Sequence, residues 1–146
     1  MKRSWIIGTL AGLAATSAQA GDEGFGVRAG FSMDPDQFVL GAHMETGRVL
    51  GPACLVPSVD LHVDDNNLIM INVDARWYLL PIPDTGLEIY GGVGPALAIA
   101  DGDNEIGFTV TGGLDIPSSR GRRYAVETRF GFSDMPDLKL MFGITW

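Results

Sequence analysis

The chain has 146 residues, enough for one domain, and carries 10 Lys and Arg against 18 Asp and Glu, a formal net charge of −8. This acidic balance argues against nucleic acid as a partner, because phosphate contacts need clustered Lys and Arg. Cys54 is the only cysteine, which excludes an internal disulfide.

Residues 1–20 have the features of a secretory signal peptide. A basic start, Met1-Lys2-Arg3, precedes an apolar stretch from Trp5 to Ala15 and the small-residue site Ala18-Gln19-Ala20. The apolar stretch is shorter than the ~18–20 residues that a transmembrane helix needs. We therefore expect export, with cleavage after Ala20 leaving residues 21–146 as one β-barrel domain.

After Gly24, apolar residues alternate with polar or small ones, which predicts strands rather than helices. In chain order the alternating segments are 25–32, 38–45, 55–64, 68–79, 87–99, 106–115, 124–132 and 138–146. The clearest is 68–79. Ile71, Val73 and Trp77 fall on one face there, whereas Asp74 and Arg76 share the other, as only a strand allows.

Short segments rich in Gly, Pro, Asp and Asn separate these strands and predict turns. Connections this short make each strand antiparallel to the one before it. A meander of eight strands has two open edges, and closure into a barrel removes both. The predicted fold class is all-β: an eight-stranded antiparallel up-and-down barrel.

Alternation alone leaves open which face points inward. A soluble lipocalin-like carrier has an apolar interior, whereas an outer-membrane barrel turns its apolar face to lipid. Three features favour the second arrangement. After the signal peptide the only lysine is Lys139, charges of both signs share the polar face, and glycine recurs on that face, as a crowded lumen requires: Gly26, Gly30, Gly41, Gly92, Gly94, Gly107, Gly113, Gly131 and Gly143.

Buried charges persist only when they are paired and hydrogen-bonded. The polar face therefore predicts a charge network that plugs the lumen, and its expected members are Arg28, His43, Glu45, Asp60, His62, Asp74, Arg76, Glu88, Glu127 and Arg129.

The last strand alternates up to an aromatic end, with Phe142, Gly143 and Trp146 at its key positions. This pattern resembles the C-terminal assembly signal of bacterial outer-membrane β-barrels, and the whole of 24–146 resembles the small barrels of the outer-membrane protein A and X class. The resemblance implies an outer-membrane location, insertion by the barrel-assembly machinery, and contact with membrane lipid and lipopolysaccharide as a monomer. It also places both termini on the periplasmic side.

The four connections at the opposite end are short and acidic, and that end is called the acidic rim. Such carboxylates could bind divalent cations, but Asp and Asn are ordinary turn formers, and this second interpretation is favoured. The weak metal candidates are Asp34, Asp36, Asp64, Asp65, Asp101, Asp103, Asp134 and Asp137. At the other end, Arg48, Arg120, Arg122 and Arg123 could meet anionic headgroups or solvent.

His43 and His62 are expected inside, with His43 roughly opposite Asp60 if the chain folds back near 47–52. Two histidines and a carboxylate could bind zinc, but no ligand-spacing motif supports this, so a hydrogen-bond network is favoured. No cofactor is expected.

Eight strands leave an interior that side chains fill. We therefore expect a structural role or a very narrow channel. The lipocalin-like carrier is the alternative. A lipid-modifying enzyme is disfavoured, because no serine combines with a histidine near one rim.

Overall fold

The structure, a computed structural model, describes residues 23–34, 36–64 and 67–146. The predicted signal peptide and Asp65 lie outside this part of the chain. The described residues form the following strands: β1 (Glu23–Met33), β2 (Gln37–Thr46), β3 (Arg48–Leu50), β4 (Ala53–Val63), β5 (Leu68–Pro81), β6 (Glu88–Ala100), β7 (Asp103–Pro117), β8 (Arg123–Phe132) and β9 (Leu138–Thr145).

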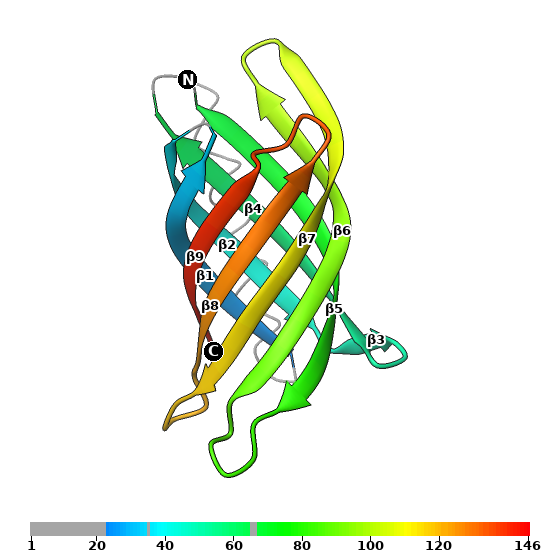
Figure 1. Cartoon of the computed structure of the whole chain (residues 1–146), viewed down its shortest axis with the longest axis vertical. Helices are drawn as coiled ribbons and strands as arrows, with labels where there is room; N and C mark the ends of the chain where they lie inside the picture. The colour runs from blue at the N-terminus through cyan, green and yellow to red at the C-terminus, as the bar shows by residue number, and fades with distance from the viewer. Residues whose placement is uncertain (1–22, 35, 65–66) are drawn as a thin grey trace, which may run out of the picture.

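The strands form one antiparallel sheet that closes on itself, because β1 pairs with both β2 and β9 (Figure 1). Eight of the described strands make the barrel wall, since β2 pairs directly with β4. The short β3 also pairs with β4 and only lengthens the β2–β4 hairpin beyond Gly47. Gly47 has a left-handed φ of 72°. The predicted eight-stranded up-and-down barrel is thus confirmed, with β3 as an addition to the expected connection 47–52.

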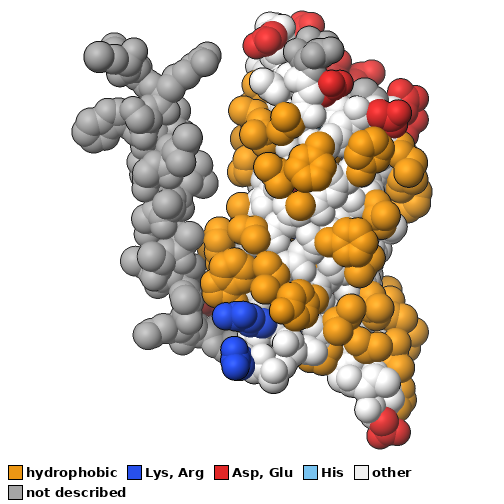
Figure 2. Space-filling view, turned by 90° about the vertical axis from the view of Figure 1, so that its left-hand side faces the viewer, with side chains coloured by type: hydrophobic (Ala, Val, Ile, Leu, Met, Phe, Trp, Pro, Cys, Tyr) orange, Lys and Arg blue, Asp and Glu red, His pale blue; other side chains and the backbone are white. Residues whose placement is uncertain are grey.

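The predicted orientation of the two faces is also confirmed. Outward side chains are apolar and exposed, for example Val110 at 41% and Phe142 at 59%, whereas the inward Arg129 is 1% exposed. Apolar side chains cover much of the visible barrel wall (Figure 2). This arrangement is the inverse of a soluble β-barrel and excludes the apolar interior that a lipocalin-like carrier needs.

The inward glycines make room for large neighbouring side chains. A Cβ atom on Gly113 would overlap the ring of Tyr90, and one on Gly41 would overlap the carboxylate of Asp60. Gly143 lies on the same inward face, where its missing Cβ would be 3.5 Å from the Cβ of Arg28. The crowded lumen predicted from the glycine pattern is therefore present.

The closing seam reaches the last residue of the chain. Phe25 and Trp146 exchange two backbone hydrogen bonds of 3.0 Å each, and their rings meet edge to face with centroids 6.1 Å apart. Trp146 thus closes the barrel at the end that carries the C-terminus, called the terminal end below. In the described part of the chain we find no helix long and apolar enough to cross a membrane.

Deletion of Trp146 should lower the free energy of unfolding by about 1–3 kcal/mol, because it removes two backbone hydrogen bonds and an aromatic contact. The matched control is Trp146→Phe, which keeps the backbone bonds and a ring. The measurement is urea unfolding in detergent micelles, followed by heat-modifiable gel mobility. Equal unfolding midpoints for the deletion variant and the unaltered protein would contradict the role of this seam.

Candidate functional site: the charged interior

Glu127 of β8 lies at the centre of the lumen and binds groups from three other strands. Its Oε1 accepts hydrogen bonds from Arg28 Nη1 at 3.1 Å and Arg129 Nη2 at 3.2 Å. Its Oε2 accepts from Arg76 Nη2 at 2.9 Å and from the Tyr90 hydroxyl at 2.8 Å. One carboxylate thus links three guanidinium groups. A buried anion needs such partners, because their hydrogen bonds replace the hydration that it loses.

Towards the acidic rim, two of these three arginines have a further acidic partner. Arg28 binds Asp60 through two hydrogen bonds of 2.9 Å, in the paired geometry that suits a guanidinium and a carboxylate. Arg129 Nη2 donates to Asp74 at 2.6 Å. Lys139 Nζ lies 3.6 Å from the Asp60 carboxylate, so Asp60 forms ion pairs with both Arg28 and Lys139.

Towards the terminal end, Glu45 accepts hydrogen bonds from Arg76 at 3.0 Å and from Arg123. Arg123 also donates to Asp115 at 3.3 Å, and the Tyr78 hydroxyl donates to Asp115 at 3.2 Å. The ion pairs therefore continue from the centre of the lumen to the terminal end.

The interior charges balance in number. The interior charge network comprises five cations and five anions: Arg28, Arg76, Arg123, Arg129, Lys139, Glu45, Asp60, Asp74, Asp115 and Glu127. Equal numbers matter because an unpaired charge in a narrow, dry lumen is strongly unfavourable. The arrangement can hold the wall strands together across the lumen.

Seven of the ten predicted interior residues belong to this network, and sequence reasoning missed three of its members. Lys139 and Asp115 are on the polar face of their strands, yet neither is among the ten predicted members. Arg123 is expected from the sequence to meet headgroups or solvent at the end opposite the acidic rim, yet its side chain is only partly exposed and turns inward. The alternation of β8 indicates this inward position, because Arg123, Ala125 and Glu127 are spaced two residues apart and share one face of the strand.

The two predicted histidines are buried but lie in different surroundings. His43 Nε2 is 2.9 Å from the Thr145 hydroxyl, and His62 Nδ1 is 3.1 Å from Gln37 Oε1. The expected pairing of His43 with Asp60 was wrong. His43 pairs with Ser58, because the β3–β4 pairing shifts register between Arg48 and Leu50 and does not continue the ladder set by the turn at Gly51-Pro52.

Glu88 was expected in the lumen, but its side chain is exposed at the start of β6. It lines a hollow of about 230 Å³ at the terminal end, together with Glu23 and Arg123. The alternation correctly predicted that Glu88 lies on the inward face of β6. However, β6 begins beyond the packed interior, and Tyr90 is the first residue of this strand that is buried there.

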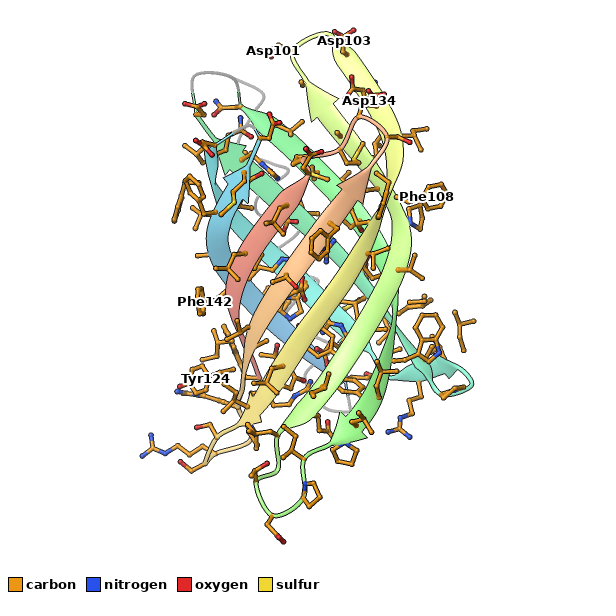
Figure 3. The ribbon with its side chains drawn as sticks, viewed as in Figure 1. Asp101, Asp103, Phe108, Tyr124, Asp134 and Phe142 are labelled. Carbon is orange, nitrogen blue, oxygen red and sulfur yellow. The ribbon has the colours of Figure 1, made fainter. Side chains whose placement is uncertain are left out.

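The described carboxylates of the acidic rim are exposed and lie at or beside the turns: Asp34, Asp36, Asp64, Asp101, Asp103, Asp134 and Asp137. Asp101, Asp103 and Asp134 lie at this rim in Figure 3, and acidic side chains gather there in Figure 2. Among the described residues, no group of three or more His, Cys, Asp or Glu side chains is placed to hold a metal ion. Divalent-cation binding stays a prediction.

The other site predictions concern exposed arginines and a serine. Arg48, Arg120 and Arg122 are exposed at the terminal end, where contact with headgroups remains a prediction. The Ser58 hydroxyl accepts a hydrogen bond of 2.9 Å from Arg28. Its register partner His43 instead lies against Thr145, so this pair does not form a nucleophile and base.

Comparison with known proteins identifies the fold. No family model and no curated protein sequence matches the chain. Among solved structures, it is similar to the N-terminal β-barrel domain of Pseudomonas aeruginosa OprF, with a TM-score of 0.66 and 12% identity over 84% of this chain and 94% of that one. It is also similar to Neisserial surface protein A (TM-score 0.64, 11% identity, 84% and 94% coverage). A de novo designed transmembrane β-barrel matches with a TM-score of 0.57 and 18% identity, over 89% of this chain and 98% of that one. At these identities the likeness shows the fold: the chain has the architecture of small eight-stranded transmembrane β-barrels.

Glu127→Gln should destabilise the barrel by about 3–5 kcal/mol, because it leaves three buried guanidinium groups short of one negative charge. Glu88→Gln is the matched control, since the same change at an exposed site should alter stability by about 0.5 kcal/mol or less. Urea unfolding of both variants in micelles measures the difference. If the two substitutions cost the same, Glu127 does not hold the interior together.

Proposed function

We propose that this chain is an integral outer-membrane β-barrel protein whose apolar wall contacts lipid and whose plugged interior gives it a structural role. The observation that carries the proposal is the inverted distribution of side chains. Exposed apolar residues surround the wall, whereas ten charged groups form ion pairs inside it. Burying charge while exposing Val, Leu and Phe is unfavourable in water and favourable in hydrocarbon.

The outward aromatic residues support the proposal, because they gather near both ends of the wall. One group lies towards the acidic rim: Phe31, Phe38, Phe108, Phe130 and Phe132. The other lies towards the terminal end: Phe25, Trp77, Tyr124 and Trp146. Phe108 and Tyr124 mark the two levels, with Phe142 between them (Figure 3). Transmembrane barrels carry aromatic girdles at both membrane interfaces.

The bacterial outer membrane is the location that best fits the fold together with the predicted signal peptide. In that setting the barrel-assembly machinery would insert the chain, with Phe142, Gly143 and Trp146 as its signal. The acidic rim would then face outward beside lipopolysaccharide phosphates, and the terminal end would face the periplasm. The short turns of the acidic rim (34–36, 64–67, 101–102 and 133–137) offer little surface for adhesion.

The filled interior favours a structural role over transport. The space enclosed by Arg28, Arg76 and Glu127 amounts to about 10 Å³, which is room for about one water molecule. Passage of a solute would require several ion pairs to separate within a wall of eight strands. We therefore propose a monomeric, non-catalytic barrel without a cofactor.

Cell fractionation tests the location. The mature chain should sediment with the outer membrane, resist extraction by salt or carbonate, and dissolve only in detergent, because its wall is apolar. A resident outer-membrane barrel and a soluble periplasmic protein serve as markers. Recovery of the folded chain in the aqueous periplasmic fraction would overturn the proposal.

Val110→Arg tests whether the wall faces lipid. Val110 lies in the middle of β7, so in a bilayer this change should destabilise the protein by about 2–4 kcal/mol, whereas Ile106→Arg, near the rim, should cost about 0–1 kcal/mol. In a water-soluble barrel both exposed substitutions would be nearly neutral. Urea unfolding in lipid vesicles measures both variants. Similar, small effects at the two depths would contradict lipid contact.

A further inference from the structure

The two ends of the lumen are built differently. At the acidic rim, the turn between β8 and β9 folds back over the opening. Met135 and Pro136 of this turn are buried although they lie in a connection, and Met135 is only 4% exposed. Asp134, the residue before them, stays exposed on the outside of the same turn (Figure 3). The chain thus points its apolar side chains inward at this turn and its acidic one outward.

Met135 packs into an apolar layer across the lumen. It forms a cluster with Met70 of β5 and with Ala96 and Ala98 of β6, and Leu68 packs against this cluster. These residues are named the lid: Leu68, Met70, Ala96, Ala98, Met135 and Pro136. Val39, Val56 and Met141 are also buried apolar residues of the inward face, but they do not belong to this cluster.

Two inward glycines make the space for the lid. A Cβ atom on Gly107 would lie 2.7 Å from Met135 Cγ, and one on Gly131 would lie 2.7 Å from Met135 Cβ. The layer rests directly on the interior charge network, because Lys139 Nζ lies 3.0 Å from the Met70 sulfur. Close packing of this kind hinders the entry of water.

Among the residues that the structure describes, no apolar cluster of this kind lies at the terminal end. The hollow of about 230 Å³ opens there between Glu23, Glu88, Arg123 and Thr145. Arg123 is partly exposed, and it holds Glu45 and Asp115 by ion pairs. Water can therefore reach the outermost ion pairs of the network from this end, and the enclosed space beyond them holds about one water molecule.

We propose that the lumen is a blind vestibule, open to solvent at the terminal end and sealed by the lid at the acidic rim. The lid excludes water by apolar packing, whereas the network behind the vestibule excludes solutes by charge pairing. The blind vestibule extends the proposed function. Only one part of it, the assignment of the open end to the periplasm, rests on that function. The barrel then presents its acidic rim to the outside as a closed surface.

Thiol accessibility in detergent micelles tests the seal without depending on the cellular location. In a Cys54→Ala background, three single-cysteine variants report on different positions: Ala98→Cys at a buried position within the lid, Asp134→Cys on the outer side of the turn that carries Met135, and Glu88→Cys in the vestibule. A charged, membrane-impermeant thiol reagent should modify the last two rapidly. The Ala98→Cys variant should react roughly 100-fold more slowly, because its reaction waits for local opening.

Removing the lid side chain should release this protection. Met135→Gly, added to Ala98→Cys, should bring the reaction rate close to that of Asp134→Cys, and Met135→Leu, which refills the space, should preserve protection. Met135→Ala replaces the glycine variant if heat-modifiable mobility shows that the latter does not fold. Rapid reaction of Ala98→Cys with the lid intact would overturn the seal, and unchanged protection without Met135 would overturn its assignment to this residue.

Discussion

The structure depends on the neutralisation of charge inside a narrow cylinder. Glu127 binds three arginines from three strands, and the acidic partners of these arginines extend the contacts around the wall. Removal of any one partner would leave an unpaired charge in the lumen. The free energy that this costs is far larger than the free energy that an exposed ion pair contributes. The network therefore acts as a common core, although almost all of its members are residues that soluble proteins keep at the surface.

The apolar wall and the charged core require each other. A β-strand has two faces, so a chain that turns Val93 and Val110 outward necessarily turns its intervening residues inward. With eight strands the lumen is too narrow for bulk water, and polar side chains must satisfy one another. Glycine at positions such as Gly113 is the local consequence, because Tyr90 occupies the space that a side chain there would need.

The difference between the two rims gives the barrel a direction. Met135 closes one end with apolar contacts, whereas Arg123 stands at the other with its charge partly hydrated. The two ends therefore respond differently to salt, which screens the partly exposed ion pairs of Arg123 and leaves the apolar packing of Met135 intact. With the proposed lid, a barrel of this design has one closed end and one hydrated end.

The sequence by itself determined the strands, their antiparallel order, the closure and the inward face, because a period of two is a local property that each strand displays. It also identified Arg28, Asp60 and Glu127 as interior residues by parity. Only the tertiary structure decided which charges meet, since Arg28 and Glu127 are 99 residues apart and touch across the lumen. The point at which each strand begins left Glu88 exposed and brought Arg123 inside. The register shift between Arg48 and Leu50 set the partner of His43, and the fold-back of Met135 formed the lid. Alternation specifies a face, whereas depth along the barrel and contact across it arise only when the sheet closes.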